Sequence, residues 1–295
     1  MSIRQVFAVS LLLALASVAH AADRDFAQTV KADAHGSVRI SNVAGKVLVT
    51  GWDRAEVEVK ARLYGNVERV DVFSDSGRTT IRVILPRSSM RSGEADLEIH
   101  IPEQSDLDVS AVSADVETTR LLGPQRLSTV SGEIRSEFVK DFEGKTVSGD
   151  LRLKGKSEPG DVRISSVSGD VFLERAGGDV EVTSVSGDLI LDVASVTTVR
   201  TRTTSGDLSL RGALARDGSV EAETISGDVT VRVKPQGGFQ YEARSFSGSI
   251  GNCFGQHAEN TSTHGPGSRL NGTAGEGHGR VRVKSMSGDV AICDR

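Results

Sequence analysis

A short motif, Ser-Gly followed by an acid, recurs along this chain of 295 residues and constrains the fold more than any other feature. Intact copies begin at Ser131, Ser148, Ser168, Ser186, Ser205, Ser226 and Ser287. Degenerate copies begin at Ser113 and Ser247, and successive copies are 17 to 21 residues apart, except for a last interval of 40. A repeat of about 19 residues with small length changes suits one turn of a solenoid, which absorbs insertions at its corners.

Apolar residues occupy fixed positions relative to the motif serine. They stand six, four and one residue before it and three and five residues after it, as in Val180, Val182, Val185, Leu189 and Leu191 around Ser186. Apolar residues two apart, with charges such as Glu181 between them, indicate half-buried strands. Each repeat therefore predicts two short strands joined at a Ser-Gly-Asp corner. Stacked turns would align the apolar columns as internal ladders about 4.8 Å apart.

The corner chemistry supports an all-β fold. Glycine takes the positive φ that a tight corner needs, while Ser and Asp cap local backbone donors. No stretch after the leader shows a 3.6-residue apolar stripe. We therefore expect a β-solenoid (β-helix-like) with turns of about 19 residues. An antiparallel β-sandwich is the alternative, but it explains only the alternation and not the fixed offsets from the corner.

The start of the chain has the pattern of a signal peptide over residues 1–21. Arg4 precedes a short apolar run, and Ala19-His20-Ala21 offers the small-x-small cleavage pattern. The apolar run is short for a membrane span, and the mature chain contains no transmembrane candidate. No cysteine near the cleavage point could carry a lipid anchor. The pattern predicts an exported protein, periplasmic or secreted.

The mature chain is expected to divide in two. Residues 22–107 contain longer alternating runs, and Ser41–Trp52 (SNVAGKVLVTGW) is similar to a worn repeat. We predict an atypical β-rich N-terminal cap over residues 22–107, because a solenoid must close its open core at each end. We expect residues 108–295 to form the repeat β-solenoid, with a Gly-rich insertion at 254–279. A separate small β domain is the second choice for the N-terminal part.

Composition excludes nucleic acid as a partner. The net charge is −5 and aromatic residues are only 4% of the chain. Binding to a phosphate backbone needs basic surface, and a stacking platform for bases needs exposed aromatic rings.

The corner sequences and the tail resemble a known family. The corners VSGDV and TSGDL, the segment IPEQSDLDVSAVSADV (101–116) and the tail GSRLNGTAGEGHGRVRVKSMSGDVAI (267–292) are similar to the bacterial putative-adhesin domains. The spacing of Leu270, Gly272, Gly275 and Gly277 before the last corner is the more specific part. The resemblance implies a β-solenoid of unknown function in an envelope context, and it brings no catalytic residues.

Two cysteines form a candidate disulfide. Cys253 and Cys293 both stand six residues after the serine of their repeats, in a column that is otherwise polar and outward. If 254–279 bulges out, the two lie on adjacent turns, within disulfide range. If 254–279 forms a full intervening turn, they lie about 9.6 Å apart and cannot bond. We predict the bond, as a staple on the C-terminal cap in an oxidising compartment.

The corner acids are a possible cation site. They include Asp150, Asp170, Asp188, Asp207, Asp228 and Asp289. Carboxylates stacked about 4.8 Å apart repel one another and could attract Ca²⁺, but the calcium β-roll pattern is absent. We therefore expect each Asp to cap its own corner and face water. His257, His264 and His278 match no standard zinc spacing, so we expect a solvated loop and no metal or cofactor.

These patterns favour a non-catalytic binding module. No nucleophile elbow, phosphate loop or other catalytic motif is present. The outward columns suit an adhesin-like module or a cell-envelope scaffold that recognises an envelope protein or glycan, as a monomer or with weak self-association. The alternatives are a polysaccharide-active β-helix enzyme that uses the corner carboxylates, and a self-assembling structural protein.

Overall fold

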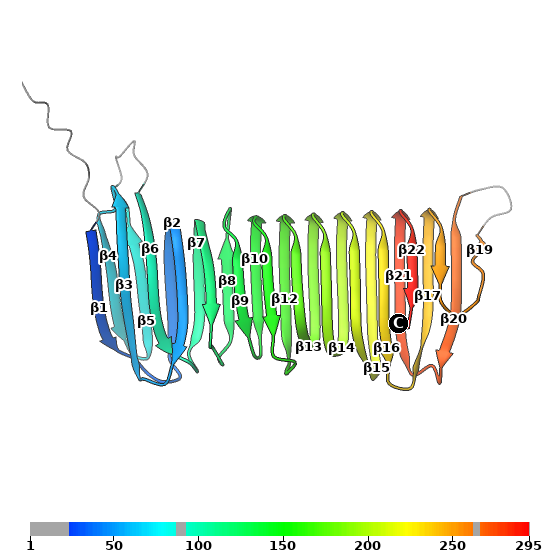
Figure 1. Ribbon diagram of the computed structural model, residues 1–295, viewed down its shortest axis with the longest axis horizontal. Helices are drawn as coiled ribbons and strands as arrows, with labels where there is room; N and C mark the ends of the chain where they lie inside the picture. The colour runs from blue at the N-terminus through cyan, green and yellow to red at the C-terminus, as the bar shows by residue number, and fades with distance from the viewer. Residues whose placement is uncertain (1–23, 87–92, 262–265, 295) are drawn as a thin grey trace, which may run out of the picture.

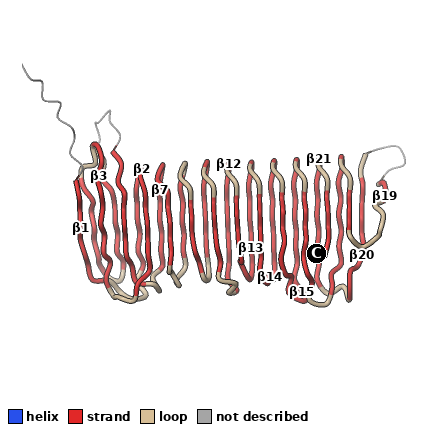
Figure 2. The backbone as a smooth tube through the Cα atoms, viewed as in Figure 1, coloured by secondary structure: helices blue, strands red, loops and turns tan. Residues whose placement is uncertain are grey.

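The chain folds into one long row of β-strands. The structure is a computed structural model, and it describes residues 24–86, 93–261 and 266–294. Strands stand side by side along the whole length (Figure 1), and the described residues contain no helix (Figure 2). This confirms the all-β, solenoid-like class. In that part of the chain no helix has the length and apolar character needed to cross a membrane. The expected signal peptide lies outside the described residues.

The N-terminal part of the chain forms a group of strands of 7 to 16 residues. Their bounds are β1 (Arg24–Lys31), β2 (Ser37–Trp52), β3 (Glu56–Gly65), β4 (Arg69–Asp75), β5 (Arg78–Ile84), β6 (Gly93–Pro102) and β7 (Asp106–Thr119).

The repeats then follow as shorter strands or as long strands that bend through a turn. Their bounds are β8 (Gln125–Thr129), β9 (Ile134–Phe138), β10 (Phe142–Ser148), β11 (Leu151–Gly155), β12 (Pro159–Ser168), β13 (Val171–Ser186), β14 (Leu189–Ser205), β15 (Leu208–Ser226), β16 (Val229–Pro235), β17 (Gly238–Ser247), β18 (Ile250–Asn252), β19 (Glu259–Asn260), β20 (Ser268–Gly275), β21 (Gly279–Ser287) and β22 (Val290–Cys293).

Each repeat contributes one strand segment to each of two sheets. The segments that lead into a corner form the pre-corner sheet, which includes β8, β10, β12 and the last parts of β13, β14 and β15. The segments that leave a corner form the post-corner sheet, which includes β9, β11 and the first parts of β13, β14 and β15. Neighbouring repeats pair in parallel, with the corner serines aligned. Parallel pairing rules out the β-sandwich of hairpins.

The core lies between the two sheets. In the turn around Ser186, Val180 and Val182 on one sheet and Leu189 and Leu191 on the other are at most 2% exposed. The same columns are buried in the other repeats, so the aliphatic residues form continuous ladders along the long axis. Burial of these ladders is the main favourable term for the fold.

At the N-terminal end, β2 does not lie at the edge. It pairs in parallel with β7 on one side and with β5 and β6 on the other, although β5 and β6 follow it in sequence. Antiparallel pairs β4–β5, β3–β6 and β1–β3 complete this end. Residues 41–50 of the worn repeat are therefore aligned with the segment 110–119 of β7.

The C-terminal turn lies inside the row in the same way. β21 and β22 pair with β15 and β16 on one side and with β17 and β18 on the other. Figure 1 shows these red strands between the yellow and the orange ones. Antiparallel pairing of β20 with β17 follows on the outer side. The turns therefore do not stack in sequence order at this end, because the last turn is inserted between two earlier ones.

A column of charged residues gives a physical reason for this order. The outward position five residues before each corner serine, with its equivalents in β2 and β7, forms what we call the charge ladder. In spatial order it reads Arg39, Asp108, Arg126, Glu143, Arg163, Glu181, Arg200, Glu221, Arg282 and Glu242. The sign alternates at every step. Stacking in sequence order would place Glu221 beside Glu242, and the inserted turn separates them with Arg282.

Reversing the charge of Arg282 should weaken this arrangement. In Arg282→Glu three carboxylates would lie on successive turns, and we expect a loss of about 1 kcal/mol in the free energy of unfolding, given that the side chain is 42% exposed. Urea denaturation measures it. Arg280→Glu is the control, because Arg280 lies between the neutral Ser219 and Gln240. Equal losses in both variants, or a loss that persists in about 1 M salt, would contradict the explanation.

Candidate binding face

The corner aspartates bind the backbone of the neighbouring turn. The Oδ1 atoms of Asp170 and Asp188 accept the N–H of Asp188 and Asp207, each at 2.9 Å. Similar bonds involve Asp115, Asp150, Asp207, Asp228 and Asp289. The expectation that each Asp caps its own corner is therefore wrong, because the carboxylate of one turn lies directly against the free N–H of the next. These carboxylates hold successive turns together.

The hydrogen bond to Asp289 also changes the pKa of its carboxyl group. The N–H of Ser249 donates to Asp289 at 2.8 Å and lowers the pKa of that carboxyl group. Where a carboxylate accepts a backbone donor it is already stabilised without a cation. Within the described ranges no group of three His, Cys, Asp or Glu side chains could hold a metal ion.

Among the described residues, the histidines of this segment form no metal-binding group. His278 lies 3.1 Å from Arg216 and 3.3 Å from Glu276. His257 is exposed in the segment after Cys253. His264 falls in 262–265, outside the described residues.

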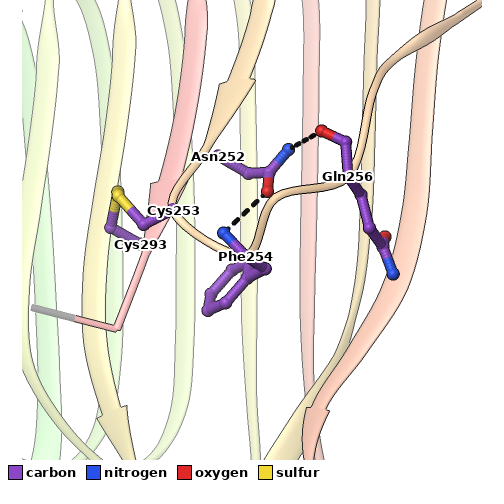
Figure 3. Close-up of a disulfide and its surroundings, with 5 residues drawn as sticks. All are labelled: Asn252, Cys253, Phe254, Gln256 and Cys293. Atoms are coloured by element: carbon purple, nitrogen blue, oxygen red, sulfur yellow. Dashed lines mark hydrogen bonds between the residues drawn. A yellow bond between two sulfur atoms is a disulfide. The ribbon is translucent and has the colours of Figure 1, made fainter.

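The two cysteines form a disulfide bond. β18 and β22 are direct neighbours, and the Cα atoms of Cys253 and Cys293 are 5.0 Å apart. Figure 3 shows the bond beside a tight loop in which Asn252 accepts from the N–H of Phe254 and donates to the carbonyl of Gln256. The bond therefore ties the inserted C-terminal turn to the turn outside it.

One apolar column points into solvent. The residues directly before the corner serines were expected to join the internal ladders, but they project outward from the pre-corner sheet. We call this column the corner ridge. In spatial order it reads Val43, Val112, Val130, Val147, Val167, Val185, Thr204, Ile225, Met286 and Phe246. Exposure rises along it from 37% at Val43 to 59% at Phe246.

Buried hydroxyl groups explain why the expectation failed. The position two residues before the corner serine is Ser or Thr in every repeat from Thr129 onward, and these side chains are at most 7% exposed. Ser184 and Thr203 donate to the carbonyl oxygens of Ser186 and Ser205, at 3.1 and 3.2 Å. The strand period places this hydroxyl inward, so the apolar residue after it must face out. The Ser or Thr that recurs at this position is the sequence signal that predicts an outward direction for the next residue.

The corner ridge and the charge ladder lie on one surface, the outer face of the pre-corner sheet. A shallow groove of about 330 Å³ crosses the ladder from Arg39 to Arg163. Asp106, Asp141 and Asp161 line it together with the ladder residues. Charged groups of both signs thus alternate within one strip, beside a ridge that is apolar at every position except Thr204. Such a surface suits extended recognition of a partner better than enclosure of a small molecule.

Ion pairs on this face lower the pKa values of three glutamates. Hydrogen bonds from Lys145 and Arg126 lower the pKa of Glu143, and a bond from Lys284 lowers that of Glu223. Burial acts to raise the pKa of Glu242, but the charges of Arg244 and Arg282 outweigh it, so the net direction is down.

Acid should therefore weaken the fold through these groups. Their stabilising contribution is present above the ordinary glutamate value of 4.5 and is lost as the pH falls below it, through the lowered folded-state values. We expect the melting temperature to be flat between about pH 7 and pH 5 and to fall below that range. Replacing all three glutamates by glutamine should flatten the acid slope. An unchanged slope in that variant would assign acid sensitivity to other groups.

Comparison with known families identifies the chain at this level. Residues 37–293 match the model of the Toastrack DUF4097 family, so the protein belongs to that family. This confirms the resemblance drawn from the corner sequences. Among curated proteins, none matches.

Several solved structures match the chain at low sequence identity and low TM-score. A putative cell adhesion protein from Clostridium sporogenes is 9% identical over 92% of this chain and 99% of its own, with a TM-score of 0.25. A putative adhesin from Bacteroides fragilis is 12% identical over 91% and 97%, with a TM-score of 0.42. One from Parabacteroides merdae is 13% identical over 72% and 92%, also at 0.42. At these values we transfer no function from them.

Proposed function

We propose that the protein is an exported, non-catalytic, adhesin-like binding module or scaffold of the cell envelope, and that it binds through the outer face of the pre-corner sheet. The corner ridge carries this proposal. Ten successive turns give it a length of about 43 Å at the strand spacing of a sheet. Soluble monomers rarely expose an apolar strip of this size without using it. An envelope protein or glycan is the expected partner.

The state of the corner carboxylates supports a non-catalytic role. An enzyme of the polysaccharide-cleaving type needs a carboxyl group poised as acid and another as base or nucleophile. Asp170, Asp188 and Asp207 instead accept backbone N–H groups at 2.8 to 2.9 Å, in the same way at successive corners. Repeated identical bonding supports a structural use of these groups.

We infer the following organisation for the exported chain. Residues 1–21 are removed as a signal peptide, which directs the protein to the periplasm or beyond. Residues 22–107 act as the cap and 108–295 as the solenoid with turns of about 19 residues, although β7 (106–119) runs through this boundary. The segment 254–279 is the insertion that supplies β20 as an outer strand.

Sedimentation with envelope fractions tests the binding face. The mature chain (22–295) is mixed with envelopes from its own cells, and bound protein is measured for wild type and for Ile225→Glu/Met286→Glu. These two side chains are 51% and 58% exposed, so the fold should tolerate the change. We expect at least about a tenfold loss of affinity, because desolvated charge opposes burial of the ridge.

Ile190→Glu is the matched control. Ile190 is an exposed apolar residue, 42% accessible, but it lies on the post-corner sheet. It should bind envelopes like the wild type. Absence of wild-type binding, or an equal loss in both variants, would overturn the proposal.

A further inference from the structure

We propose that the outer face of the pre-corner sheet binds a second copy of this chain, with the two solenoids antiparallel about a two-fold axis that runs along the strand direction. This inference rests on the proposed function and names the partner of the same surface. Three independent properties of the surface favour that occupant: its charge order, its graded side-chain size and its area.

The charge ladder is complementary to its own reverse. It has ten positions of alternating sign, beginning with Arg39 and ending with Glu242. In an antiparallel pair each position meets the one counted from the other end, so every odd position meets an even one. Arg39 thus meets Glu242 of the partner subunit, and every guanidinium along the strip lies opposite a carboxylate. Complementary charge of this kind fixes register and orientation.

The spacing of the ladder also limits the choice of partner. Its charges recur once per turn, at the spacing of hydrogen-bonded strands, about 4.8 Å. A partner that matches ten such charges must present opposite charges with the same period. A second copy of this surface does so by construction.

The corner ridge is graded in size in the same sense. Its first six members are valines, from Val43 to Val185, and its largest members, Ile225, Met286 and Phe246, stand at the other end. In the antiparallel pair, the large side chains of one copy therefore lie over the small side chains of its partner. A parallel pair about an axis along the solenoid would place Phe246 against its own copy.

The outward position three residues before each corner serine forms a column between the ridge and the ladder, and it is also graded in size. It begins with Ser41, Ser110 and Ser128 and ends with Glu223, Lys284 and Arg244. Reversal places the long charged side chains over the serines. Lys145 opposite Arg202 is the one pair of like charges in this column.

The area is that of a small, weak protein interface. The ridge stands four residues after the ladder, so the strip is about 43 Å long and about 13 Å wide, which gives roughly 560 Å² on each copy. Weak, transient interfaces bury less than about 1,200 Å² in total, against about 1,600 Å² for a standard one. Because half of the contacts are charged and exposed at the rim, we expect micromolar dissociation that weakens with salt.

Sedimentation velocity of the mature chain, from about 1 to about 200 µM, tests the dimer. The wild type should change from monomer to dimer, and Ile225→Glu/Met286→Glu should raise the dissociation constant at least about tenfold, whereas Ile190→Glu should leave it unchanged. Monomer at every concentration would overturn the inference. If the ridge variant then still loses envelope binding, the proposed function stands and only the identity of its partner is wrong.

Single cysteines test the orientation. The two-fold axis passes between Val167 and Val185, so a bismaleimide cross-linker that spans about 10 Å, the distance between packed sheets, should join Val185→Cys to its own copy. It should not join Phe246→Cys, because the two copies of that residue would lie about 43 Å apart. Cross-linking of Phe246→Cys but not of Val185→Cys, or of both equally, would overturn the antiparallel arrangement. Both positions are exposed, so the substitutions should not disturb folding.

Discussion

Replacing Gly187 by alanine is expected to lower the free energy of unfolding by about 3 kcal/mol. Gly187 has a φ of +111°, a conformation that other residues rarely adopt. A Cβ atom there would also lie 2.3 Å from the carbonyl oxygen of Gly169 on the preceding turn. Backbone cannot move aside cheaply, so the corner would have to open. Urea denaturation with an unchanged m-value measures the loss.

Gly77→Ala separates the two causes. Gly77 also has a positive φ, +78°, but no other atom lies within 4 Å of its Cβ position. It should cost only the conformational part, about 1 kcal/mol. If both variants lose the same stability, the close approach of Gly187 to the preceding turn contributes nothing, which would contradict this explanation.

Removing the disulfide is expected to have an effect of similar size. The bond closes a loop across 40 residues, and Cys253→Ser/Cys293→Ser should lose about 3 kcal/mol. The inserted turn ends at Cys293, so its release also exposes the edges of β16 and β18. Thermal melts with and without reductant measure the effect. Reductant should lower the melting temperature of the wild type and leave the variant unchanged; no effect on the wild type would contradict this role.

Much of the fold follows from the repeat. The offsets of Val180, Val182, Leu189 and Leu191 from Ser186 predict two buried strand segments per turn, and they are buried as expected. The polar column after the corner predicts the pairing of Cys253 with Cys293. These inferences succeed because strand period and corner position are local properties of the sequence.

The apolar column directly before the corner serines faces solvent and not the core, and the reason is physical. The apolar character of Val185 predicts a core position, whereas the period set by Val180 and Val182 places Ser184 inward and Val185 outward. At this column the hydrophobicity of the residue and the two-residue strand period predict opposite directions for the side chain, and the structure follows the period. An apolar residue at an outward position indicates a contact surface, which is how the corner ridge could have been found.

The order of the turns is not a local property. The spacing of the corner motifs gives the length of each turn but not its neighbours in space. It therefore cannot show that β21 and β22 lie between earlier strands. The sign of the charges does carry a signal. Glu221 and Glu242 would be neighbours in a sequential stack, and Arg282 is the residue that separates them.

The insertion of the C-terminal turn keeps the charge ladder alternating at its end and places Met286 between Ile225 and Phe246 in the corner ridge. Engineered cysteine pairs test it directly. Ser226 is aligned with Ser287, and Ser287 with Ser247. Adjacent turns about 4.8 Å apart allow a disulfide, whereas alternate turns about 9.6 Å apart do not. Peptide mapping after oxidation should find the bond in Ser226→Cys/Ser287→Cys and not in Ser226→Cys/Ser247→Cys. The opposite result would show that the turns stack in sequence order.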